Sequence, residues 1–102
     1  MAAKALSSEI TENITELKKL RVKTPGDDSV YNRLQDMYDA LHQAYGKEWE
    51  EQDAQYKEAK KALDEAKQSA QNAINDLGKT AEAIQKSAKA FAAVLAALAL
   101  FL

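Results

Sequence analysis

The chain has few residues that would interrupt or cross-link a fold. Its 102 residues include no cysteine, one proline and three glycines. The absence of cysteine excludes disulfides and thiolate chemistry, and so few turn-forming residues argue against an all-β or α/β chain. Ala, Glu, Lys, Gln and Leu dominate after residue 47, which is a composition typical of helices. We therefore expect a single helical domain spanning residues 1–102.

The chain also lacks a strong net charge and an N-terminal apolar stretch. The formal net charge is −2, so we expect no nucleic-acid partner. The acidic residues concentrate in residues 27–58, which carry nine acidic and three basic side chains. Residues 1–8 have no apolar core of a signal peptide, so we expect no cleavable signal. Cytoplasmic location and secretion without a signal both stay open.

The sequence contains few candidates for a catalytic, phosphate-binding or metal-binding site. Gly78-Lys79-Thr80 matches the end of a phosphate-binding loop, but Ala73 stands where that motif needs glycine. His42 lies one helical turn from Asp39, and as the only histidine it cannot complete a di-metal site within one chain, although a dimer could in principle. The acidic run around Trp49 has no glycine-bearing calcium loop. We therefore expect no enzyme, no metal, no cofactor and no small-molecule substrate.

Two amphipathic helices are predicted in the N-terminal half, at about 7–23 and 28–45. The first is indicated by apolar residues spaced four, four, three and three apart, with Ser7 or Ser8 as its N-cap: Leu6, Ile10, Ile14, Leu17 and Leu20. Thr24-Pro25-Gly26 predicts a tight turn, and Asp27, Asp28 or Ser29 then caps the second helix. A turn this short favours an antiparallel pair.

The second helix carries a row of tyrosines and ends near a glycine. Tyr31, Tyr38 and Tyr45 are seven residues apart, and we expect them at the rim of the core with buried rings and hydroxyls in water. Gly46 either ends the helix or lies inside a continuous one, because Leu41, Tyr45 and Trp49 keep a helical spacing. The sequence leaves both alternatives open.

The C-terminal half repeats an apolar residue every seven positions. The row is Trp49, Tyr56, Leu63, Ala70, Leu77, Ile84, Phe91 and Leu98. A sustained heptad predicts one edge of a helix that packs against a partner helix. Because the row continues across Gly78, we expect one long helix at about 48–102, with a break at Gly78 as the alternative. The predicted fold is an all-α antiparallel helical hairpin or bundle of two short helices and this long one.

The last thirteen residues, Ala90 to Leu102, contain no polar side chain. Their bulky members fall on the heptad edge, and we expect them to form a partner interface: Phe91, Val94, Leu95, Leu98, Phe101 and Leu102. The predicted function is a non-enzymatic interaction module that self-assembles or binds a partner protein. The alternative is membrane docking by residues 90–102, although a thirteen-residue helix is too short to span a bilayer.

Overall fold

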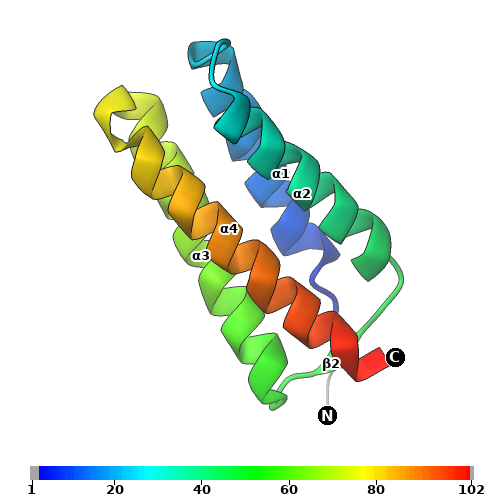
Figure 1. Ribbon diagram of the computed structural model, residues 1–102. Coiled ribbons are helices and arrows are strands. Elements are labelled where there is room, and N and C mark those ends of the chain that lie inside the picture. The colour runs from blue at the N-terminus through cyan, green and yellow to red at the C-terminus, as the bar shows by residue number, and fades with distance from the viewer. Residues whose placement is uncertain (1–2, 102) are drawn as a thin grey trace.

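A computed structural model describes residues 3–101 and shows four α-helices in this range, packed along their lengths (Figure 1). The helices are α1 (Ser7–Lys23), α2 (Asp28–Ala44), α3 (Ala54–Asn75) and α4 (Thr80–Leu98). The molecule measures 42 × 20 × 17 Å. The prediction of an all-α fold is confirmed.

Four short elements lie at the ends of the helices. The strands β1 (Ala3–Lys4) and β2 (Trp49–Glu50) pair antiparallel, with Ala3 opposite Glu50. The 3-10 helix η1 (Leu77–Lys79) connects α3 to α4, and η2 (Ala99–Phe101) follows α4. We call the end of the bundle that holds β1, β2 and η2 the base. The opposite end, which holds the turns after α1 and α3, is the turn end.

The helices form two hairpins that pack side by side. In Figure 1, α1 rises from the base and α2 returns to it, and α3 and α4 repeat this path. The hairpins meet through α1 on α3 and through α2 on α4. Going round the bundle, the order is therefore α1, α2, α4, α3. The segment between α2 and α3 must cross the base of the bundle diagonally, because these two helices are not neighbours in that order.

The apolar side predicted for the first helix is buried in the structure. The five apolar residues expected on one face of α1 are all buried, and Val30, Leu34 and Met37 of α2 are buried with them. The Asp27 carboxylate caps α2 by accepting hydrogen bonds from the backbone N–H groups of Ser29 and Val30. At α1 the expected serine cap is wrong: the N-cap residue is Leu6, and no side chain caps this helix.

The helix α2 ends before Gly46, which decides between the two alternatives for this glycine. Gly46 has a φ of +80°, a left-handed conformation that favours glycine at the end of a helix. After it the chain becomes extended through β2. The helix α3 begins only after Asp53, whose carboxylate accepts hydrogen bonds from the backbone N–H groups of Gln55 and Tyr56.

The expected single helix over residues 48–102 is wrong, because the chain reverses direction between Asn75 and Thr80. Asp76 is extended, and its carboxylate accepts a hydrogen bond from Gly78 N at 3.1 Å. Thr80 begins α4, and its hydroxyl donates to the Leu77 carbonyl at 2.7 Å. The physical reason is burial: folding back covers the alanine-rich side of α3 with α4, which a straight helix would leave in water.

The heptad row is therefore divided between separate elements. Trp49 lies in β2, whereas Leu77 lies in the turn and is 48% exposed. Tyr56, Leu63 and Ala70 are buried along α3, and the row resumes on α4. Each helix needs its own apolar side, so an unbroken seven-residue spacing in the sequence did not require an unbroken helix.

Small residues form most of the buried surface of α3 and α4. Eight alanines are buried on the two helices: Ala59, Ala62, Ala66, Ala70, Ala73, Ala83, Ala90 and Ala97. Ser69, Thr80 and Ser87 are also buried there. Small side chains let two helix axes approach closely, and α3 and α4 form the most extensive helix contact in the described part of the chain.

Candidate functional site

The outward side of the last two turns of α4 is entirely apolar. Six residues of this side and of η2 are exposed, and we call them the C-terminal apolar face: Ala92, Leu95, Ala96, Ala99, Leu100 and Phe101. Its three large side chains, Leu95, Leu100 and Phe101, are 40%, 49% and 44% exposed. Since no polar side chain follows Lys89 in the sequence, this surface has no charge of its own.

The predicted interface residues separate into three groups in the structure. Val94 and Leu98 are buried inside this chain and do not reach its surface. Phe91 is half-buried and packs against the core. Leu95 and Phe101 are exposed on the C-terminal apolar face, whereas Leu102 lies outside the described residues.

Trp49 joins the base of the bundle to the end of α4. Its ring is 3% exposed, and its indole N–H donates a hydrogen bond to the Ala97 carbonyl at 3.0 Å. That carbonyl belongs to the last turn of α4 and also accepts a hydrogen bond from the backbone N–H of Ala99, the C-cap residue. The Trp49 ring also meets the Phe101 ring edge to face at 5.1 Å. These contacts hold η2 against the base and fix the position of the C-terminal apolar face.

Carboxylates flank this surface at the base. Glu48 and Glu50, the neighbours of Trp49, are both exposed, because the side chains of an extended segment alternate between inside and outside. Farther up α4, Lys86 lies 3.9 Å from Glu65 of α3. Along α4, the C-terminal apolar face therefore lies on the base side of Lys86, at the same end of the bundle as Glu48 and Glu50.

Groups with shifted pKa values lie elsewhere, at the contact between α1 and α3. Burial raises the pKa of the Glu9 carboxyl above its ordinary value of 4.5, and the neighbouring Asp64 carboxyl adds to the shift. The carboxylates of Asp64 and Glu12 raise the pKa values of Lys60 and Lys67, respectively. These groups form a network of ion pairs, and none of them borders the C-terminal apolar face.

The described residues offer no arrangement for metal binding. Among residues 3–101, no three or more His, Cys, Asp or Glu side chains are grouped so that they could hold a metal ion. His42 and Asp39 are both exposed on α2. By length and composition alone, one helical stretch of these residues, Leu77–Phe101, is apolar enough to cross a membrane, and 28% of its most apolar window is buried in the fold.

Sequence reasoning missed four members of the C-terminal apolar face: Ala92, Ala96, Ala99 and Leu100. These four residues follow one another at intervals of four, three and one positions, so they lie on one side of a helix. Ala90, Val94 and Ala97, which are buried, lie on the opposite side. This signal is readable only when α4 is treated as a separate helix. The heptad row selected the inward side of α4, so it included two core residues in the predicted interface.

No protein-family model, curated protein or solved structure matches this chain.

Proposed function

We propose that this protein is a helical interaction module that self-associates through the C-terminal apolar face. The observation that carries the proposal is the exposure of Leu95, Leu100 and Phe101 on a surface without a polar side chain. Exposed apolar patches of this kind are typical of interaction sites in soluble proteins. The rigid attachment of this surface to the base through Trp49 supports the same function, because a preorganised surface loses less entropy on binding.

The preferred partner is a second copy of the chain. The exposed Ala92 and Ala96 share one side of α4, and the exposed Ala99 follows them at the start of η2. Two such helices can approach closely, as α3 and α4 do inside the chain through their alanines. A two-fold interface places the same patch of both copies in contact, and an uncharged apolar surface is compatible with itself.

The experiment is a measurement of mass in solution by light scattering. We expect the wild-type chain to have a multiple of its 11.2 kDa mass, and the double variant Leu95→Glu/Leu100→Glu to have the mass of one chain. Two buried carboxylates without partners would cost several kcal/mol at the interface. Both leucines are exposed in the single chain, so the fold itself should persist, and circular dichroism checks this.

A matched control carries the same kind of change at the opposite end of the molecule. Val22 and Leu77 are 80% and 48% exposed and lie near the turn end. The double variant Val22→Glu/Leu77→Glu should keep the wild-type mass. The proposal is wrong if the wild-type chain has the mass of a single copy. It is also wrong if both double variants have the mass of a single copy.

A second candidate function is docking on a membrane, which the apolar stretch Leu77–Phe101 favours. Glu48 and Glu50 at the base disfavour it for anionic lipid, since carboxylates are repelled by that surface. Flotation with neutral and anionic vesicles separates the two functions. Membrane docking would be supported if the wild-type chain floats with vesicles, the Leu95→Glu/Leu100→Glu variant does not, and the two have the same mass in solution.

A further inference from the structure

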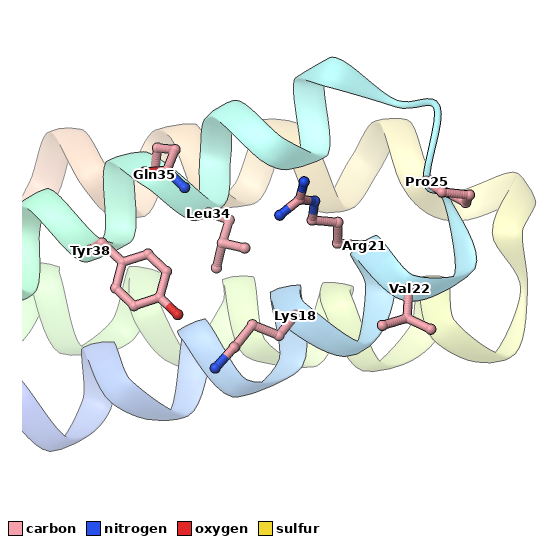
Figure 2. Close-up of a pocket in the computed structure, with 7 residues that line it drawn as sticks. All are labelled: Lys18, Arg21, Val22, Pro25, Leu34, Gln35 and Tyr38. Carbon is pink, nitrogen blue, oxygen red and sulfur yellow. The ribbon is translucent and has the colours of Figure 1, made fainter.

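A groove runs along the outer side of the N-terminal hairpin, between α1 and α2. One hollow of this groove has a volume of about 380 Å³ and is lined by Lys18, Arg21, Val22, Pro25, Leu34, Gln35 and Tyr38. Figure 2 shows Lys18 and Arg21 reaching this space from α1, with Leu34 and Tyr38 facing them from α2. The groove therefore combines cations on one wall with an aliphatic and an aromatic side chain on the other.

The two cations of this groove have no carboxylate partner among residues 3–101. Lys18 is exposed and forms no ion pair there. The Arg21 guanidinium lies over the Tyr31 ring, 4.3 Å from its centroid, so an aromatic face and not an acid holds it in place. Its N–H groups remain able to donate to a carboxylate, which a guanidinium binds through two parallel hydrogen bonds.

On the opposite side of α1, where it meets α3, the lysines are paired with carboxylates. There Lys19, Lys60 and Lys67 all lie within 4 Å of a carboxylate, the closest being Lys67 to Glu12 at 2.8 Å. Cations are thus neutralised where α1 meets α3 and left unneutralised in the groove between α1 and α2. This difference makes the groove complementary to an acidic ligand.

The groove is extended along α2 and lined by tyrosines. A second hollow, of about 450 Å³, shares Tyr38 with the first and is lined by residues of α2 and its C-cap alone: Tyr38, Leu41, His42 and Tyr45. Tyr38 borders both hollows and is 39% exposed, and Tyr45 is 77% exposed. Tyrosine is enriched at protein interfaces because its ring supplies contact area and its hydroxyl stays hydrated. Two hollows in line fit an elongated chain better than a compact small molecule.

The charged residues along the groove also favour one orientation of a bound chain. Lys18 and Arg21 line the hollow that also includes Pro25 of the turn, whereas Asp36 and Asp39 border a neighbouring hollow that shares Gln35 and Tyr38 with it and continues to His42. A continuous chain of phosphates would meet these aspartates, which disfavours nucleic acid. A peptide with its carboxylates at one end avoids them.

We propose that the groove between α1 and α2 binds an acidic peptide segment of a partner protein. Carboxylates of the peptide contact Lys18 and Arg21, an apolar side chain of the peptide packs on Leu34 and Tyr38, and its following residues lie along Tyr45. This site is separate from the C-terminal apolar face, so either can fail without the other.

The test uses a short synthetic peptide with glutamates at one end and leucines at the other, and a second peptide with lysines replacing the glutamates. Each is titrated into the isotope-labelled full chain and followed by NMR. We expect the glutamate peptide to shift signals of Val22, Leu34 and Tyr38, with little change at Leu95 and Leu100. The lysine peptide should bind at least about tenfold more weakly.

Two charge-reversed variants decide the assignment. The variant Lys18→Glu/Arg21→Glu should weaken binding of the glutamate peptide roughly tenfold or more, because two attractive contacts become repulsive. The control Lys57→Glu/Lys79→Glu changes the net charge equally at exposed lysines outside the groove, and it should bind within about twofold of the wild type. Circular dichroism establishes that both variants are folded.

The proposal is overturned if the groove variant binds the glutamate peptide as tightly as the control does. It is also overturned if the lysine peptide binds equally well, or if the shifted signals belong to the C-terminal apolar face. A wild-type chain that has the mass of a single copy in the light-scattering experiment, but still binds the glutamate peptide, would count against the proposed function alone.

Discussion

The two hairpins of this bundle bury different kinds of side chain. The N-terminal hairpin buries mainly large aliphatic residues, such as Ile10, Leu17 and Met37, whereas the C-terminal hairpin buries mainly alanines. Alanine removes little apolar area from water, so α3 and α4 gain most of their stability from close contact and from the large residues of α1 and α2. The C-terminal hairpin in turn keeps Leu95 and Leu100 on its surface. The large aliphatic core residues and the exposed C-terminal apolar face thus lie on different hairpins.

The largest expected effect comes from removing a large core residue of the first hairpin. Leu17→Ala should lower the free energy of unfolding by about 2–5 kcal/mol, because Leu17 is 1% exposed and its loss leaves a cavity. Urea unfolding followed by circular dichroism measures this value. A change below about 1 kcal/mol would mean that the N-terminal hairpin does not supply the core.

The second hairpin should be sensitive to a larger side chain in its core, because its helices pack through alanines. Ala90 is fully buried on α4, and Ala90→Leu should destabilise the protein by about 1–3 kcal/mol through overpacking. The exposed neighbour Ala92 is the matched control, since Ala92→Leu has room for the larger side chain. Equal stability of the two variants in urea would show that α3 and α4 are not in close contact.

The smallest effect concerns Glu9, at the contact between the hairpins. Its pKa is raised in the fold, so the fold disfavours the ionised carboxyl, and stability is lost as the pH rises through that pKa. Glu9→Gln is uncharged at every pH. It should be slightly more stable than the wild type near neutral pH, by up to about 0.5 kcal/mol, and lose this advantage below the ordinary glutamate pKa. Thermal unfolding across this pH range measures the difference, and an advantage that grows on acidification would contradict the assignment.

The sequence predicted the first hairpin better than the second for a physical reason. The spacing of Leu6 to Leu20, followed by Thr24-Pro25-Gly26 and Asp27, specifies a helix, a turn and a cap with residues that have few alternatives. Alanine, by contrast, is equally compatible with the inside and the outside of a helix. The apolar side of α3 and α4 was therefore assigned from a heptad row of larger residues that continued by coincidence across the turn at Asp76.

The candidate sites depended on contacts that sequence spacing does not contain. Asp76 ends α3 through a hydrogen bond to Gly78, and this local turn decides which side of α4 faces outward. Trp49 was expected on a helix, yet it packs on the end of α4 from an extended segment. The three tyrosines were expected to have buried rings, but Tyr31, Tyr38 and Tyr45 are all exposed beside the groove. A seven-residue spacing places the three tyrosines on one edge of a helix, but it does not determine whether that edge faces the core or the solvent.

Single-cysteine cross-linking tests the proposed self-association most directly, because the chain has no cysteine of its own. Ala96 lies in the C-terminal apolar face, and Ala81 is another exposed alanine, near the start of the same helix. Under mild oxidation, the Ala96→Cys variant should form a disulfide-linked dimer rapidly, and the Ala81→Cys variant should not. Equal cross-linking of the two variants, or none in either, would contradict association through this face.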